Sequence, residues 1–246
     1  MIERYLEQVR ERLTTIGVAQ LDNMECAAEL IAEATVSGHR FFAFGCSHSS
    51  LLVQDIYYRA GTFMLVHPLF GPGMSLGDDF PPSKTSAMEG ISGLAQVILD
   101  ASPAAAGDVL LVVSTSGRNR VPVEMVRIAK ERGMVVIALT SMAYSTSVES
   151  RDGSGAHVHD LADVVLDNMA PVGDAALDLN ELATAIGPVS SVTGTAMLHA
   201  IMARVAERWL EKGLTPPVYM SGNLDAGPSF NREMMQKYRD LLPFSP

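Results

Sequence analysis

The chain has 246 residues, of which 48% are hydrophobic, and its formal net charge is −10. This length and composition predict one globular α/β domain with a large core and exclude a disordered chain. The negative charge excludes the clustered basic surface of a nucleic-acid-binding protein, and charges or glycines interrupt every apolar stretch before it could span a membrane. The two cysteines, Cys26 and Cys46, form neither a disulfide framework nor a zinc spacing, so we expect a cytoplasmic protein that holds no metal.

The chain begins with two predicted helices. Residues 2–16 repeat apolar side chains at helical spacing between charges, which is typical of an amphipathic helix and not of a signal peptide. A second helix is predicted over residues 18–36, with Gly38 as its C-cap. We expect residues 1–37 to take part in oligomerisation; the alternative is that both helices cover the sheet of their own subunit.

Two strand–turn–helix units follow, and each has small hydroxyl-bearing residues in its turn. The first runs from a strand at 41–44 through the turn GCSHSS to a helix at 51–59. The second runs from a strand at 108–113, apolar on both faces, through the turn STSG to a helix that ends near Gly133. Because both strands are expected in one parallel sheet, both turns lie at its carboxyl edge, where ligands of open α/β sheets bind.

The remaining elements complete an alternation of strands and helices. This alternation predicts an α/β fold in three layers, with a doubly wound, five-stranded parallel sheet flanked by helices. A long loop at 71–83, rich in Gly and Pro, has a length that is often functional. The other predicted elements are strands at 62–70, 134–140 and 163–166, helices at 87–101, 189–213 and 231–242, a polar stretch at 141–160, a turn region at 167–174 and a C-terminal tail at 215–246.

The two turns have the composition of an anion site. A turn between a strand and a helix directs backbone N–H groups and the positive helix end at one point, and phosphate is the usual occupant. Ser and Thr hydroxyls add donors at low bulk, and Gly117 lets the backbone come close to the ligand. Helix capping is the alternative role for these hydroxyls, but capping uses one hydroxyl per helix and each turn offers several.

The pair of turns resembles those of the sugar isomerase (SIS) domain family. The resemblance extends to GDVLLVVSTSGRN at 107–119, ALTS at 138–141 and GPVSSVTGTA at 187–196, and it covers about residues 1–240. Within the family the chain is similar to the stand-alone, heptose-isomerase-like branch, and there to a phosphosugar-binding group with YRAG, GRNxxPxE and DNxxPxGD segments. The resemblance implies a flavodoxin-like fold that forms a single SIS domain over residues 1–246, a homodimer or homotetramer, and a sugar phosphate bound between the two turns without a nucleotide cofactor.

The resemblance also implies the ligands of the phosphate, by motif. They are Ser114, Thr115 and Ser116 with the Gly117 backbone, joined by Ser47 and Ser49. Ser50 in the first turn is a further candidate for the same cavity. So are Ser190, Ser191 and Thr193 at the start of the late helix, where capping is the alternative for one of the three but not for all. Arg118 either neutralises the phosphate or lies in solvent, and Asn119 is expected to cap the next helix.

Aldose–ketose isomerisation needs a base that moves a proton between adjacent carbons and an acid for ring opening. Glu89 is the first catalytic candidate, because glutamates near this point contact the sugar in several branches of the family; the alternative is a solvated residue in the first turn of the 87–101 helix. His48 is the second, as an acid/base group or a phosphate donor. The heptose isomerases carry a Glu near the position of Arg59 and a catalytic His on the late helix. Neither has a clear counterpart here, and His199 is predicted to be a partly buried core residue.

Two further groups of polar residues are open to a structural or a functional interpretation. Asp167, Asn168 and Asp174 either order a turn or bind sugar hydroxyls. His157 and His159 would lie on one side of a strand, but two ligands do not make a metal site.

These observations favour an enzyme, a sugar-phosphate isomerase. Met88-Glu89-Gly90 resembles a Glu-Gly segment of the family's muramic-acid-phosphate etherases, so a lyase or etherase acting on an amino-sugar phosphate is an alternative. A phosphosugar sensor without turnover is another. The first 40 residues contain no basic recognition helix, which argues against a DNA-binding regulator.

Overall fold

The computed structural model describes residues 1–76 and 81–243. Its centre is one parallel sheet of five strands: β1 (Phe41–Gly45), β2 (Val66–Leu69), β3 (Val109–Val113), β4 (Val135–Thr140) and β5 (Val164–Asp167). The strands lie in the order β2-β1-β3-β4-β5, so the direction in which the sheet grows reverses between β1 and β3. The predicted doubly wound α/β sheet is confirmed.

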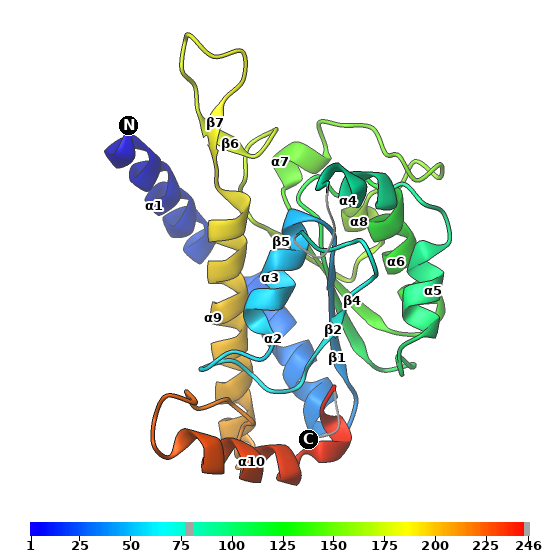
Figure 1. The fold of residues 1–246 in the computed structure, drawn as a ribbon, viewed down its shortest axis with the longest axis vertical. Helices are drawn as coiled ribbons and strands as arrows, with labels where there is room; N and C mark the ends of the chain where they lie inside the picture. The colour runs from blue at the N-terminus through cyan, green and yellow to red at the C-terminus, as the bar shows by residue number, and fades with distance from the viewer. Residues whose placement is uncertain (77–80, 244–246) are drawn as a thin grey trace.

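Helices cover both faces of the sheet, with α2 (Leu21–Val36), α3 (His48–Ile56) and α9 (Ser190–Glu211) on one side and α5 (Leu94–Asp100) and α6 (Arg120–Glu131) on the other (Figure 1). Alternate residues of a strand point to opposite faces, and the two faces pack into separate cores. In β1, Phe41 and Ala43 belong to the core with α2, α3 and α9, whereas Phe42 and Phe44 belong to the core with α5 and α6. Every side chain of β1 and β3 is buried, as their unbroken apolar sequence requires.

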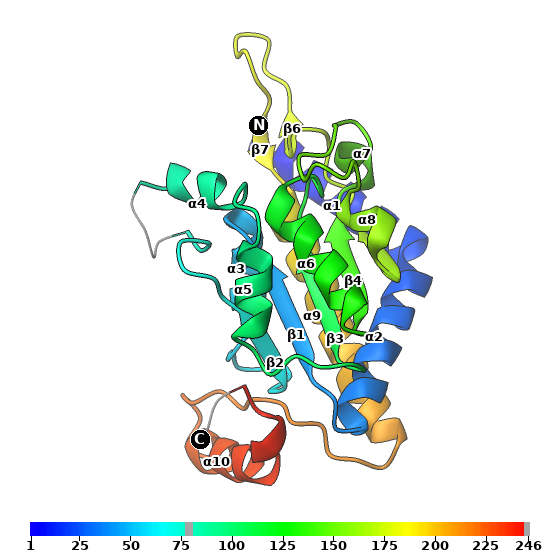
Figure 2. The same ribbon diagram turned by 90° about the vertical axis from the view of Figure 1, so that its right-hand side faces the viewer.

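Two elements stand away from this three-layer body. In α1 (Ile2–Ala19), all of whose residues are described, only Ile16 is buried. An antiparallel hairpin of β6 (Ala175–Leu177) and β7 (Ile186–Pro188) projects beyond the sheet near the N-terminus (Figure 2). The sequence analysis did not predict this hairpin, because two strands of three residues are too short to show an alternating pattern.

Several boundaries differ from the predictions. The helix predicted at 87–101 is two helices, α4 (Ser83–Met88) and α5, because the chain turns between them and Gly93 adopts a φ of +79°. The strand predicted at 62–70 is limited to β2, and the helix predicted at 51–59 already begins at His48. The loop predicted at 71–83 falls partly on residues 77–80, outside the described residues.

The second half of the chain contains further short elements. The polar stretch at 141–160 includes α7 (Met142–Ser145) and α8 (Val158–Leu161), and the helix predicted at 231–242 is α10 (Gly227–Lys237) followed by a 3-10 turn. The tail returns to the edge of the sheet, where the His67 ring is hydrogen-bonded to Leu241 O at 2.8 Å. Within the described ranges, no helix has both the length and the apolar character needed to cross a membrane.

Candidate functional site

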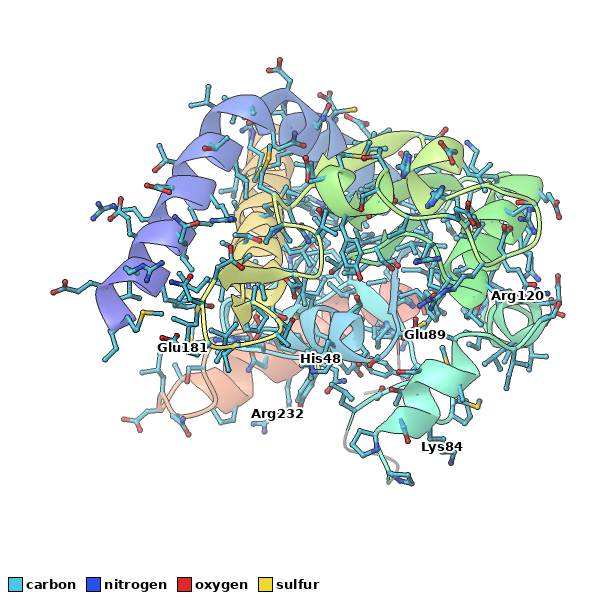
Figure 3. The ribbon with its side chains drawn as sticks, turned by 90° about the horizontal axis from the view of Figure 1, so that it is seen from above. His48, Lys84, Glu89, Arg120, Glu181 and Arg232 are labelled. Atoms are coloured by element: carbon cyan, nitrogen blue, oxygen red, sulfur yellow. The ribbon has the colours of Figure 1, made fainter. Side chains whose placement is uncertain are left out.

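The two hydroxyl-bearing turns begin at neighbouring points of the sheet. β1 and β3 are adjacent and parallel, and their last residues, Gly45 and Val113, are paired. The turns after them meet at the carboxyl edge, where the strand order reverses, and line one cavity of about 250 Å³. Eight of the predicted site residues line it: Ser47, His48, Ser49, Glu89, Ser114, Thr115, Ser116 and Ser190. Figure 3 looks down on this edge and shows His48 and Glu89 there.

The first turn has an unusual backbone conformation. Ser47 has a φ of +52°, a region that residues other than glycine rarely adopt outside functional sites, and its N–H donates to Met74 O at 2.7 Å. Gly45 packs against the same turn, because a Cβ there would lie 2.6 Å from Ser49 O. Ser50 does not line the cavity, since its hydroxyl points back into the helix and donates to Ser47 O at 2.7 Å.

The second turn uses some of its backbone groups to close itself and leaves its hydroxyls unbonded among the described residues. Gly117, with a φ of +64°, donates to Ser114 O at 3.1 Å and closes the turn, and the Ser114 N–H donates to Leu139 O at 2.9 Å. Within the described residues, no hydrogen bond is made by the hydroxyls of Ser114, Thr115 and Ser116 or by the backbone N–H groups of Thr115 and Ser116. These groups supply the several donors that a phosphate requires.

The start of α9 forms another wall of the cavity. The Asp174 carboxylate accepts hydrogen bonds from the Ser190 N–H at 2.8 Å and from the Ser190 hydroxyl at 2.6 Å, so it caps α9 while it also lines the cavity. Ser191 does not line the cavity. Asp167 and Asn168 order the preceding turn, because their side chains accept hydrogen bonds from backbone N–H groups two residues later.

Glu89 follows the last residue of α4, so it is not in the first turn of a helix as the sequence suggested. Its carboxylate accepts a hydrogen bond from Asn119 Nδ2. Burial raises the pKa of Glu89, while the Asn119 bond and the charge of Arg151 oppose this shift. Burial and the nearby Glu89 also raise the pKa of the Cys46 thiol, which lines the same cavity. A carboxyl group with a raised pKa is suited to exchange a proton with a ligand.

The residues after the second turn have different roles from those predicted. Asn119 occupies the N-cap position of α6, but its side chain makes no capping bond because its amide is committed to Glu89. Arg118 and Gly117 do not line the cavity, and within the described residues Arg118 Nε is buried without a hydrogen-bond partner. Arg151 reaches the cavity wall indirectly, with its Nη1 at 3.5 Å from Asn119 Oδ1.

His48 lines the cavity, whereas His199 lies on α9 and is not part of the cavity lining. His48 is exposed at the start of α3 and lines the cavity. His199 is half-buried on α9, where its Nε2 lies 2.7 Å from Asp55 Oδ2 of α3. Sequence reasoning missed this pair because its members are 144 positions apart.

His157 and His159 lie at the start of α8 and not on a strand, which corrects the predicted placement. Their rings stack at a centroid distance of 5.3 Å, and His159 Nδ1 is 2.9 Å from Ser145 Oγ. Among residues 1–76 and 81–243, no group of three or more His, Cys, Asp or Glu side chains is arranged to hold a metal.

Comparisons with known proteins agree with this architecture. The family model described as SIS domain matches residues 4–141. A UPF0309 protein from Streptomyces griseus is 42% identical over 230 residues, covering 94% of this chain and 92% of that protein. A phosphoheptose isomerase structure from Francisella tularensis has a TM-score of 0.54 at 18% identity, covering 84% of this chain and 96% of its own. The sugar isomerase domain of an RpiR transcription factor from Sphaerobacter thermophilus has a TM-score of 0.51 at 18% identity, covering 97% and 95%.

Proposed function

The chain belongs to the SIS domain family, and from that premise we propose that it binds a sugar phosphate between its two hydroxyl-bearing turns and isomerises it. The observation that carries the proposal is the convergence of both turns on one cavity, where the hydroxyls of Ser114, Thr115 and Ser116 make no hydrogen bond with a described residue. The cavity volume of about 250 Å³ is close to the lower end of the range for ligand pockets, which suits a small polar metabolite.

The phosphate is expected to lie against the second turn. Ser114, Thr115 and Ser116 line the cavity together with Ser47 and Ser49 of the first turn, and the hydroxyls and N–H groups of the second turn would donate to the phosphate oxygens. The positive end of α6 adds to the attraction for an anion. The phosphate ester is doubly charged, so it needs several donors. Among the described residues that line the cavity there is no Lys or Arg, and the hydroxyl and N–H donors would supply this stabilisation.

Glu89 is the base that we propose for the proton transfer between adjacent sugar carbons. It lies in the same cavity as the turns, and its raised pKa favours proton uptake. His48 lines the cavity and is the candidate for ring opening. The Asp55–His199 pair does not line this cavity, and its carboxylate fixes the orientation of the imidazole ring between α3 and α9.

Two alternatives share this cavity. Removal of the proton next to a carbonyl also starts an elimination, so the same Glu89 would serve a lyase or etherase that acts on an amino-sugar phosphate. Binding without turnover would make the protein a phosphosugar sensor. The fold is shared with the sugar isomerase domain of a transcription factor, which keeps the sensor among the alternatives.

We also propose that the protein is a homodimer or homotetramer in which a second copy covers α1 and the β6–β7 hairpin. Ile2, Leu6 and Ile186 are exposed around an apolar hollow of about 400 Å³ between these elements. An isolated two-stranded hairpin is marginally stable in water, so a partner surface is expected to support it. β6 follows Asp174 directly and β7 ends just before α9, so the partner would lie close to the mouth of the cavity.

The proposal is tested by incubating the protein with a panel of sugar phosphates, including amino-sugar phosphates, under observation by NMR. A new ketose or aldose establishes an isomerase, and release of lactate from an amino-sugar phosphate that carries a lactyl ether establishes an etherase. Loss of water to give an unsaturated sugar establishes a lyase, and ligand shifts without products establish a sensor. If no sugar phosphate changes the spectrum of the protein, the proposed function is wrong.

Two substitutions separate binding from turnover in the same assay. Glu89→Gln is expected to lower turnover by about 10²–10⁴-fold and to leave binding nearly intact, because it removes the base but keeps the size of the side chain. Ser116→Ala is expected to weaken binding by about 1 kcal/mol or more. Glu233→Gln and Ser229→Ala, both exposed on α10, are the matched controls and should change neither property.

A further inference from the structure

We propose that a second pocket, on the face of the sheet that carries α5, binds a small carboxylic acid with an apolar body. The pocket has a volume of about 580 Å³, more than twice that of the sugar-phosphate cavity and within the usual range of about 300–1,000 Å³ for ligand pockets. Among the described residues, none lines both spaces, so the two sites are separate.

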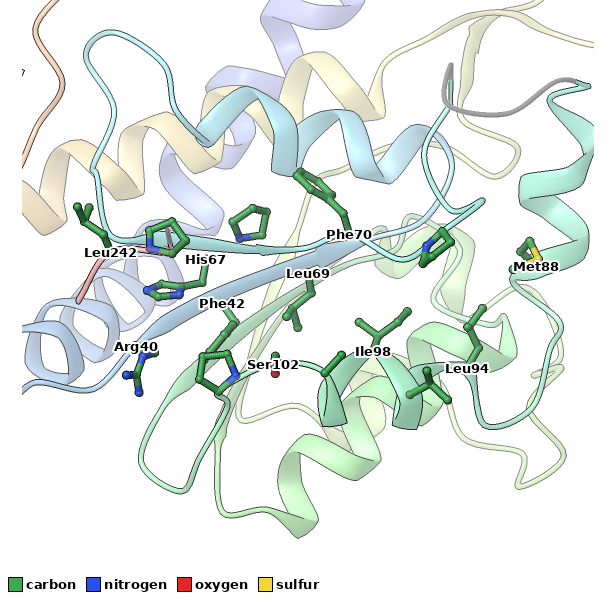
Figure 4. A pocket seen from close by; sticks show the side chains of 16 residues that line it. Arg40, Phe42, His67, Leu69, Phe70, Met88, Leu94, Ile98, Ser102 and Leu242 are labelled. Atoms are coloured by element: carbon green, nitrogen blue, oxygen red, sulfur yellow. The ribbon is translucent and has the colours of Figure 1, made fainter. Parts of the chain in front are cut away.

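The pocket exists because the edge strand is only partly covered. β2 is one of the two edge strands of the sheet, and the pocket lies between α5 and residues of β1 and β2. Phe42 and Leu69 form the floor, Ile98 and Leu94 of α5 form one wall, and Met88 closes one end (Figure 4). This part of the pocket offers carbon atoms and few hydrogen-bonding groups, so it suits an apolar body and not a sugar ring.

The opposite end is polar and carries one unpaired charge. There the His67 ring is bonded to Leu241 O at 2.8 Å and the Ser102 hydroxyl donates to Leu99 O at 2.8 Å, so both are partly committed. Burial lowers the pKa of His67, which keeps the ring neutral. Arg40 lines the pocket, and its guanidinium makes no hydrogen bond or ion pair with any described residue.

An unpaired guanidinium at the end of an apolar pocket selects the ligand. A carboxylate binds the planar fork of an arginine through two parallel hydrogen bonds, which are stronger than those between neutral groups. Arg40 and Met88 lie at opposite ends of the pocket, so the ligand carries its charge at one end and extends its apolar body toward α4 (Figure 4). Phe42 and His67 are almost fully buried at the base, a depth that a narrow small molecule fills better than the surface of another protein.

Methyl NMR of the full-length protein with ¹³C-labelled methionine tests this inference. Octanoate is the probe, 1-octanol of equal chain length is its uncharged match, and Met88 is assigned with Met88→Leu. We expect octanoate to shift the Met88 methyl resonance in a saturable manner and to leave that of Met24, on the other side of the sheet, unchanged. Arg40→Gln should weaken octanoate binding about tenfold, the effect of losing one charge-assisted pair, and should leave octanol binding unchanged.

Further variants keep the result interpretable. Arg40→Lys, which retains a positive charge, should keep most of the preference for octanoate, and Arg232→Gln, an exposed arginine on α10, should behave as the native protein. An unshifted Met88 resonance, or equal octanoate affinity in Arg40→Gln and native protein with equal melting temperatures, overturns the inference. A third result also overturns the inference. If light scattering shows that Val97→Glu forms a smaller assembly than the native protein, a second copy of the chain covers the exposed rim of this pocket. None of these three outcomes tests the sugar-phosphate cavity.

Discussion

Gly117→Ala is the substitution for which the structure gives the clearest expectation. Gly117 adopts a φ of +64°, and a Cβ there would lie 2.5 Å from Ser145 Oγ and 3.1 Å from both Thr140 Oγ1 and Val158 Cγ2. The left-handed conformation costs about 1–2 kcal/mol for a residue with a Cβ, and the forced displacement of packed neighbours costs about 1–3 kcal/mol more. We therefore expect a loss of about 2–5 kcal/mol in the free energy of unfolding.

Gly155→Ala provides the matched control. Gly155 has a φ of +83°, but no heavy atom lies within 4 Å of an added Cβ, so only the conformational cost of about 1–2 kcal/mol applies. Urea unfolding of the two variants separates the two costs. Displacement of Ser145 or Val158 would also move the second turn, so Gly117→Ala alone should lose affinity for sugar phosphates. Equal stability of the two variants, together with unchanged ligand affinity in Gly117→Ala, would refute the reasoning.

Three other expectations follow from the described contacts. Burial raises the pKa of Glu89, so the contribution of this side chain to stability is largest at low pH and is lost as the pH rises through the raised pKa. We therefore expect Glu89→Gln to melt at a higher temperature than the native protein at alkaline pH and to show no such gain in acid. Asp152 is buried; hydrogen bonds from Ser154 and Ser150, and from Arg127, outweigh its burial and lower its pKa from 3.8 to about 2. The contribution of Asp152 to the free energy of unfolding is present above pH 3.8 and is lost as the pH falls toward 2. In urea unfolding at neutral pH, Asp152→Ala should lower the free energy of unfolding by about 3 kcal/mol. A loss under about 0.5 kcal/mol would argue against a structural role. Ile186→Glu on the hairpin should reduce the number of subunits seen by light scattering, whereas Leu214→Glu, at the far end of α9, should not.

The sequence predicts the centre of the fold well, because β1 and β3 are buried on both faces and their apolar runs are unambiguous. Composition also indicated the two turns, since Ser, Thr and Gly in that position have few roles other than capping and anion binding. Glu89 was assigned to the correct neighbourhood but to the wrong helix position. The sequence predicts one helix that continues through Gly90 and Gly93, whereas in the structure α4 ends at Met88 and α5 begins at Leu94.

Contacts between distant segments lay beyond sequence reasoning. The Asp55–His199 pair joins two helices, and nothing local to either residue indicates the other. The sequence alone does not decide whether Asp174 is a turn residue or a site residue; in the structure it both caps α9 and lines the cavity. Tyr144, Cys46 and Pro122 also line the cavity, although Tyr144 lies in a helix of four residues that has no periodic signal.

A crystal structure of the protein soaked with mixed sugar phosphates tests the central proposal most directly. We expect the phosphorus to lie where the hydroxyls of Ser114, Thr115 and Ser116 and those of the first turn reach its oxygen atoms at about 3 Å, with a sugar carbon next to Glu89. Phosphate density elsewhere on the molecule, with these hydroxyls turned to the protein's own main chain, would contradict the account.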